Sequence, residues 1–216
     1  MCGIVGAVCN RDVFGILIEG LKRLEYRGYD SAGLSLIDAN SCLNTQKTIG
    51  RVADLEDLFN GEIPNGGLGI AHTRWATHGV PSSANSHPHT SGSISVVHNG
   101  IIENHNLLKK ELRDRGATLS SETDSEVIAH FVEFYSSETG SLKEAVDKTL
   151  SRLEGAYAIC VISKDYPDKM IGARSGSPLV IGLGIGEHFM ASDQMALRQV
   201  TDLSLIHISE PTRPLT

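Results

Sequence analysis

The chain begins with Met1-Cys2-Gly3-Ile4-Val5-Gly6-Ala7-Val8-Cys9, in which β-branched and small apolar residues alternate with glycines. Such a stretch is typical of a buried strand, and it predicts one that starts at the amino terminus. Asp12 then fits a helix cap, and apolar residues three to four apart predict a helix that ends before Arg27-Gly28. This strand and this helix are the first units of the predicted fold.

The rest of the sequence predicts runs of strands and runs of helices. A hairpin around Ala39-Asn40-Ser41 comes first, followed by a short helix near residues 52–59. Further strands are expected at 68–71, 94–97, 156–162, 170–173, 179–182 and 189–191, and further helices at 107–116, 127–132 and 142–153. Residues 73–92 contain two prolines and predict a long loop, and loops of that length are usually functional. Because no regular strand–helix–strand repeat occurs, the pattern favours a layered α+β fold over a doubly wound sheet.

Composition and charge exclude several classes of protein. The 216 residues include 19 Lys and Arg against 26 Asp and Glu, a net charge of −7. An acidic chain without a basic run is not expected to bind nucleic acid or a membrane surface. No stretch approaches about 18 consecutive apolar residues and no secretory signal pattern opens the chain, so we expect a cytosolic location. Four cysteines without a paired motif are expected to be free thiols.

Cys2 directly follows Met1, and this position has a chemical consequence. If the methionine is removed, one residue carries both a thiol and a free α-amine. A thiol with a pKa of about 8.5 is mostly protonated at neutral pH, whereas an α-amine with a pKa of about 8 can accept its proton. From position alone, however, a small buried cysteine is the commoner interpretation.

The segment Met1 to Gly6 resembles the start of the class II glutamine amidotransferases, which are amino-terminal-nucleophile hydrolases with a processed first cysteine. Within that class, longer segments resemble one family, the glutaminase domain of the glucosamine-6-phosphate synthases. These segments are residues 23–33, 71–79, 98–104, 121–126 and 173–179, and the resemblance covers residues 1 to about 201. It implies a four-layer αββα sandwich, hydrolysis of glutamine to glutamate and ammonia through a thioester on Cys2, and no cofactor.

The resemblance also implies roles for individual residues. Asn99 and Gly100 form an oxyanion hole, although Asn-Gly by itself is a strong turn signal. Arg74 binds the α-carboxylate of glutamine, for which a guanidinium fork is well suited, and Asp124 binds the α-ammonium. The alternatives are a surface ion pair for Arg74 and a helix cap for Asp124.

Trp75 is the only tryptophan and falls in the predicted loop. The resemblance implies that it closes over the substrate, with Thr77 and His78 in contact with glutamine. Arg27 and Gly28 resemble positions that line the side of the pocket near the nucleophile. The alternatives are a small satellite core for Trp75 and a helix terminator for Gly28.

Six of the nine histidines fall between His72 and His105, and His87-Pro88-His89 raises the possibility of a metal site. Zinc sites need cysteine or histidine ligands at fixed spacings, and no cysteine lies in this window. Hard metal ions need carboxylates. We therefore expect no metal, and interpret the histidines as a hydrogen-bonding scaffold around the pocket.

Residues 1–202 predict a single glutaminase domain, and the final residues depart from the resemblance. Leu203 to Thr216 begins like a strand but continues through Pro211 and Pro214 without a core pattern. We expect a non-native tail, with the last sheet strand missing or imitated. In the full family enzyme the ammonia passes to a sugar-phosphate isomerase domain that binds fructose 6-phosphate, and that domain is absent from these residues. The alternatives are another class II amidotransferase or a non-catalytic glutamine-binding module.

Overall fold

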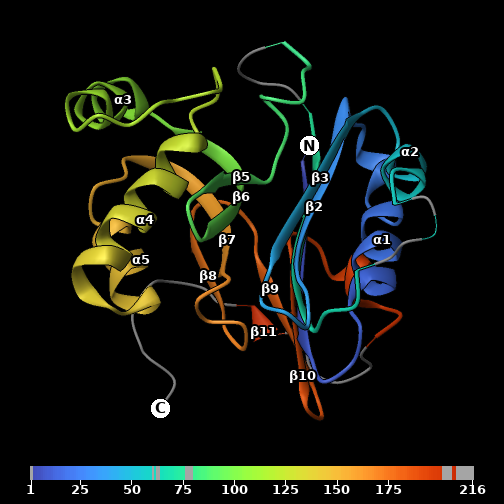
Figure 1. Ribbon diagram of the computed structural model, residues 1–216. Coiled ribbons are helices and arrows are strands. Elements are labelled where there is room, and N and C mark those ends of the chain that lie inside the picture. The colour runs from blue at the N-terminus through green and yellow to red at the C-terminus, as the bar shows by residue number, and fades with distance from the viewer. Residues whose placement is uncertain (1, 60, 62–63, 76–79, 201–205, 208–216) are drawn as a thin grey trace.

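The computed structural model describes residues 2–59, 61, 64–75, 80–200 and 206–207, and these form two facing sheets with helices on both outer sides (Figure 1). In the described chain the larger sheet has the strand order β11-β9-β10-β1-β4-β2-β3, and the smaller sheet has the order β5-β6-β7-β8. All neighbouring strands are antiparallel. The predicted α+β class and αββα sandwich are confirmed.

The strands of the larger sheet are β1 (Gly3–Cys9), β2 (Ser31–Ile37), β3 (Leu43–Ile49), β4 (Leu68–Arg74), β9 (Val180–Gly184), β10 (Glu187–Ala191) and β11 (Ile206–His207). Those of the smaller sheet are β5 (His89–Ser91), β6 (Ile94–Ile102), β7 (Gly155–Ser163) and β8 (Met170–Ser175). The outer layers contain α1 (Phe14–Lys22) and α2 (Val52–Asp57) on one side, and α3 (His105–Asp114), α4 (Glu126–Thr139) and α5 (Leu142–Leu150) on the other (Figure 1). Short 3-10 helices occur at Glu25–Arg27 and Gln194–Leu197.

The central strands are apolar on both faces because each face packs against a different layer. In β1, Ile4 belongs to the core between the sheets, whereas Val5 packs with the core beneath α1. Ile70 and Ala71 of β4 divide in the same way. Successive side chains of a strand point to opposite faces, so a strand buried in the middle of four layers needs a continuous apolar run. This explains the composition of the amino-terminal segment.

The register of β1 determines where Cys2 lies. β1 pairs with β4 so that Gly3 is opposite Thr73. The strands are antiparallel, and the start of β1 is therefore next to the end of β4. Cys2 is placed beside Arg74 and Trp75, which are more than 70 residues away along the chain.

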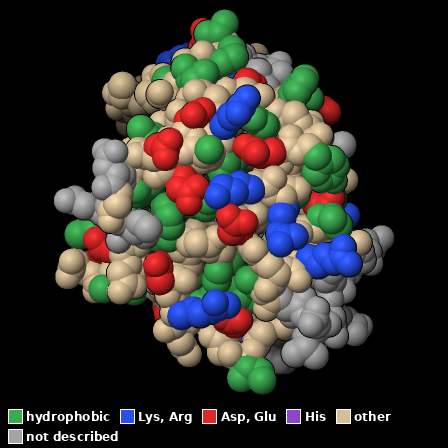
Figure 2. Space-filling view, turned by 90° about the vertical axis from the view of Figure 1, so that its right-hand side faces the viewer, with side chains coloured by type: hydrophobic (Ala, Val, Ile, Leu, Met, Phe, Trp, Pro, Cys, Tyr) green, Lys and Arg blue, Asp and Glu red, His purple; other side chains and the backbone are tan. Residues whose placement is uncertain are grey.

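The face over α1 and α2 intersperses acidic and basic side chains (Figure 2). Lys22 of α1, for example, pairs with Glu19 in the same helix and with Glu56 in α2. Among the described residues, no helix has both the length and the apolar character needed to cross a membrane. The cytosolic location stays a prediction.

Two details of the predicted secondary structure differ from the structure. The strand expected at 94–97 continues to Ile102 because β7 pairs with all of β6. The loop expected at 73–92 is shorter, since β4 extends to Arg74 and β5 forms at His89–Ser91. In the tail, Ile206 and His207 pair with Ile181 and Val180 of β9, while residues 201–205 and 208–216 lie outside the described chain.

Candidate active site

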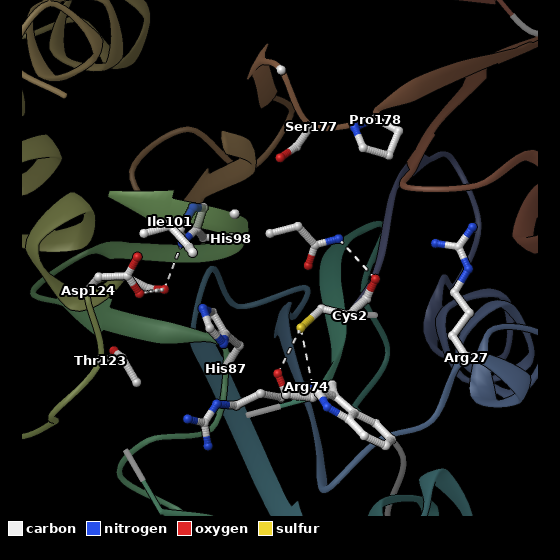
Figure 3. Close-up of a pocket in the computed structure, with 15 residues that line it drawn as sticks. Cys2, Arg27, Arg74, His87, His98, Ile101, Thr123, Asp124, Ser177 and Pro178 are labelled. Carbon is white, nitrogen blue, oxygen red and sulfur yellow. Dashed lines mark hydrogen bonds between the residues drawn. The ribbon is translucent and has the colours of Figure 1, made fainter. Parts of the chain in front are cut away.

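A cavity of about 400 Å³ lies where the ends of several strands meet (Figure 3). Its lining is Cys2, Arg27, Arg74, Trp75, His87, His98, Asn99, Gly100, Ile101, Thr123, Asp124, Ser125, Gly176, Ser177 and Pro178. Seven of the ten residues predicted for the site belong to this set. Of the other three, Gly28 lies behind Trp75, and Thr77 and His78 fall outside the described residues.

The thiol of Cys2 is half-buried in this cavity and has backbone partners from the end of β4. Its Sγ lies 3.2 Å from the Trp75 N–H, which donates to it, and 3.5 Å from the Trp75 carbonyl oxygen. Burial raises the pKa of the Cys2 thiol, and the hydrogen bond from Trp75 opposes that shift. A thiol in this environment needs a base to become a nucleophile.

Asn99 and Gly100 belong to β6, and both line the cavity together with Cys2. The Asn99 amide nitrogen donates to the Cys2 carbonyl oxygen at 3.1 Å. Gly100 pairs with Tyr157 of β7 and lines the cavity beside Asn99. The turn interpretation of Asn-Gly is wrong, because both residues pair within a strand.

The Asp124 carboxylate reaches the cavity from the segment before α4. One oxygen accepts the Ile102 N–H at 2.7 Å, and the other accepts the Ser125 hydroxyl at 3.3 Å. The cap position of α4 is Ser125, and no side chain caps the helix. The helix-cap interpretation of Asp124 is therefore wrong: the carboxylate is held by the backbone of β6 instead.

Arg74 is the last residue of β4, and its side chain is only 4% exposed. Its Nη1 lies 3.7 Å from a carboxylate oxygen of Asp30. The interpretation of Arg74 as a surface ion pair is thus wrong, because the guanidinium is buried against the cavity. Arg74 and Asp124 line the same space, and a buried cation and anion in one cavity suit a ligand that carries both charges.

Trp75 is 52% exposed, which contradicts a satellite core, and its ring lies directly against Gly28. Gly28 ends the 3-10 helix Glu25–Arg27 with a φ of +81°, whereas the first α-helix, α1, already ends at Lys22. A Cβ atom at Gly28 would lie 2.1 Å from Cζ3 of Trp75. Gly28 therefore leaves the space in which the ring sits. Arg27 beside it lines the cavity and forms a salt bridge with Asp193.

Substitution of Gly28 by alanine is expected to displace the Trp75 ring. Trp75 is the only tryptophan, so the tryptophan emission of the protein reports on this ring alone. We expect Gly28→Ala to change the emission maximum or intensity, because the new Cβ overlaps the ring. Gly61→Ala is the matched control, since Gly61 has nearly the same φ of +82° and no described residue has an atom within 4 Å of its Cβ position. Equal spectra for the two variants would contradict the contact.

Four buried histidines surround the inner wall of the cavity. His87 and His98 line it, while His72 and His89 lie behind them. Burial lowers the pKa of His72 to about 3 and that of His98 to about 4, and it lowers the pKa of His87 and His89 well below the usual value. These rings are neutral at physiological pH. His72, His89 and His98 each form a hydrogen bond through one ring nitrogen, whereas neither ring nitrogen of His87 has a partner among the described residues. Within the described residues, no three His, Cys, Asp or Glu side chains form a group that could hold a metal.

Several lining residues were not singled out as site residues from the sequence. Gly176, Ser177 and Pro178 follow β8 and line the cavity, and Ser177 and Pro178 lie across it from His87 (Figure 3). Their segment was one of those that carry the family resemblance, so the motif was a usable signal. Its place in the cavity depends on a bridge between Gly176 and Tyr157, which sequence patterns do not reveal.

The chain is similar in sequence to proteins that use glutamine as an amino donor by name. The family model described as "Glutamine amidotransferase domain" matches residues 72–199. The chain is 58% identical over 201 residues to the glutamine–fructose-6-phosphate aminotransferase [isomerizing] of Vibrio vulnificus (strain YJ016), covering 93% of this chain and 33% of the relative. It is 57% identical to the enzyme of that name from Shigella flexneri, with the same coverage. The chain thus spans about a third of the length of these curated relatives.

Two solved structures show the same fold over most of the chain. A glutamine phosphoribosylpyrophosphate amidotransferase from B. subtilis has a TM-score of 0.77 and 30% identity, over 91% of this chain and 43% of that chain. A structure described as the allosteric regulatory enzyme of purine biosynthesis has a TM-score of 0.82 and 29% identity, over 97% of this chain and 45% of that chain. In both cases the similarity covers less than half of the other protein.

Proposed function

The chain belongs to the glutamine amidotransferase family, and on that premise we propose that Cys2 is the nucleophile with which it releases ammonia from glutamine. The observation that carries this proposal is the arrangement around the thiol. Cys2 lies in one cavity with the amide of Asn99 and with the opposite charges of Arg74 and Asp124. A nucleophile, an amide donor and two charged anchors are the groups that hydrolysis of an amino-acid side-chain amide requires.

The chemistry proceeds through a thioester. With Met1 removed, the α-amine of Cys2 accepts the thiol proton, and the sulfur attacks the side-chain carbonyl carbon of glutamine. The carbonyl oxygen becomes an oxyanion, which the Asn99 side-chain N–H and the Gly100 backbone N–H stabilise. The carbon–nitrogen bond then breaks, and the protonated α-amine gives its proton to the departing ammonia. Water hydrolyses the thioester, which releases glutamate and restores the thiol.

The two charged residues orient the substrate in this proposal. The buried guanidinium of Arg74 binds the α-carboxylate, and the carboxylate of Asp124 binds the α-ammonium. The Ile102 N–H already holds the Asp124 carboxylate in place. Binding of the substrate therefore costs little side-chain conformational entropy at Asp124. Trp75, Thr77 and His78 complete the proposed contacts with glutamine, and Arg27 and Gly28 support the wall beside Trp75.

We further propose that the ammonia serves an amination of fructose 6-phosphate. The support is the 56–58% identity to glutamine–fructose-6-phosphate aminotransferases over 93% of this chain. The chain corresponds to about a third of those relatives, so the sugar phosphate would be bound by a sugar-phosphate isomerase domain that lies outside these residues. On its own the chain is expected to make ammonia and glutamate but no amino sugar.

The function is tested by measuring glutamate and ammonia released from glutamine, together with the intact mass of the protein. We expect equal amounts of the two products, and a mass that shows loss of Met1. Glutamine analogues without the α-amino or α-carboxylate group should not be hydrolysed, because each lacks a partner for Asp124 or Arg74. Glutamine binding by calorimetry without any glutamate release would instead support a non-catalytic binding module.

A further inference from the structure

His72 lies behind the proposed oxyanion pair and connects the two sheets. It is in β4 of the larger sheet and is fully buried. Its Nε2 atom is 2.9 Å from Oδ1 of Asn99 and 3.1 Å from the carbonyl oxygen of His98, both in β6 of the smaller sheet. The hydrogen bond from His72 therefore connects the larger sheet to Asn99 of the smaller sheet, the residue whose side chain lies next to Cys2.

Two backbone carbonyls determine how the Asn99 amide is oriented. The His98 carbonyl can only accept a hydrogen bond, so Nε2 of His72 must carry the proton. The Asn99 atom that faces the same Nε2 must then be the acceptor, Oδ1. On the other side, the Cys2 carbonyl can only accept, so the Asn99 atom 3.1 Å from it must be the donor, Nδ2. The two constraints are independent and agree.

The opposite end of the His72 ring is consistent with this protonation state. Nδ1 is buried and has no hydrogen-bond partner among the residues that the structure describes. A proton on Nδ1 would lack an acceptor, which is costly in a buried site. Burial also lowers the pKa of His72 to about 3, so the ring is neutral with its one proton on Nε2.

The orientation of this amide decides what the cavity offers to a substrate oxygen. With Oδ1 turned to His72, one N–H of Asn99 donates to Cys2 and the second is left for a bound oxygen. A rotated amide would present its own oxygen to the Cys2 carbonyl and to the developing oxyanion. The two ends of an amide are nearly the same size, so only hydrogen bonds distinguish them.

We propose that His72 is a positioning residue that holds the Asn99 amide with its N–H donor toward the oxyanion. The inference rests on the proposed function, because it concerns the transition state of that reaction. His72 itself touches no reacting atom. Its contribution should therefore appear in kcat, since an oxyanion exists only in the transition state and in the tetrahedral intermediate.

The first test compares His72→Leu, which removes the donor, with His72→Gln, which keeps an N–H that can reach both acceptors. We expect His72→Leu to lower kcat for glutamate release about 10- to 100-fold with little change in KM, and His72→Gln to recover most of the loss. Alkylation of Cys2 by iodoacetamide, followed by peptide mass, should proceed at the normal rate because it forms no oxyanion. An unchanged kcat in His72→Leu would overturn the proposal.

A double-mutant cycle with Asn99→Ala separates positioning from a general structural effect. If His72 acts through Asn99, adding His72→Leu to Asn99→Ala should lower kcat by less than about twofold more. His89→Leu is the matched control: His89 is equally buried but bonds Thr123 at 3.0 Å, so its effect should persist in the Asn99→Ala background. A full additional loss from His72→Leu in that background would contradict the proposal.

Two results keep the inference distinct from the function on which it rests. If the unaltered protein releases no glutamate, the proposed function fails, whatever the His72 variants do. If the unaltered protein is active and His72→Leu does not fold, the same cycle is carried out with His72→Gln, whose smaller loss must also vanish beside Asn99→Ala. Persistence of that loss would count against positioning while leaving the glutaminase function intact.

Discussion

Replacement of Cys2 by alanine is expected to abolish glutamate release, with kcat at least about 10³-fold below that of the unaltered protein. Among the described residues that line the cavity, Cys2 alone carries a sulfur, so no thioester can form in the variant. Glutamine should still bind with an affinity within about threefold of normal, because Arg74 and Asp124 are unchanged. A coupled assay for glutamate, together with calorimetry for glutamine, separates the two effects.

The control for the loss of a cysteine is Cys42→Ala. Cys42 is exposed, and its Sγ is 3.9 Å from the carbonyl oxygen of Asn40, far from the cavity. Its replacement should leave both the rate and the binding of glutamine unchanged. Retention of more than about a tenth of the activity by Cys2→Ala would exclude Cys2 as the nucleophile.

Gly100→Ala is expected to have the largest effect on stability, lowering the free energy of unfolding by about 3 to 5 kcal/mol. Gly100 has a φ of +134°, and a Cβ atom there would lie 2.0 Å from the carbonyl oxygen of Ala156. That oxygen belongs to the backbone of β7, so it cannot rotate away as a side chain would. Relief of the overlap requires the central pair of the smaller sheet, β6 and β7, to separate locally.

Gly116→Ala is the matched control for this substitution. Gly116 also has a positive φ, +87°, but in the part of the chain that the structure describes no atom lies within 4 Å of its Cβ position. It should cost only the backbone strain of about 1 to 2 kcal/mol. Urea-induced unfolding of the two variants measures the difference, and equal losses would show that the contact with Ala156 is not what requires glycine.

The close approach of Gly100 to the Ala156 carbonyl also affects the candidate active site. A glycine is needed where β7 approaches β6, and this glycine supplies the second donor of the proposed oxyanion hole. Damage to stability and damage to catalysis are therefore expected together at Gly100. At Cys2, whose side chain faces the cavity, catalysis should be lost with little change in stability.

Much of the fold was predictable because it depends on local periodicity. The apolar run in residues 3–9 predicted β1, and the spacing of apolar residues predicted α1, α4 and α5. The residues of the site were also named in advance, since Cys2, Arg74 and Asp124 lie in motifs that resemble one family. These features depend on short segments of sequence, in which each residue can be interpreted from its immediate neighbours.

The arrangement of those residues depended on contacts between distant segments. Asn-Gly is a turn signal in isolation, yet pairing with β7 more than 50 residues later keeps Asn99 and Gly100 in a strand. Asp124 is a good helix cap in isolation, yet the Ile102 N–H takes its carboxylate. In each case a long-range hydrogen bond replaced the local one that the sequence pattern favours.

By itself, then, the sequence predicted a layered α+β fold, and its motifs predicted the family, the sandwich and the chemical groups of the candidate site. Only the tertiary structure decided which way the Asn99 amide points, how Asp124 is held and why Gly28 and Gly100 must be glycine. The physical reason is that apolar periodicity acts over a few residues, whereas amide orientation and backbone clearance depend on atoms from other strands. His72 illustrates the difference: its position in β4 is local, but its partner Asn99 lies in the other sheet.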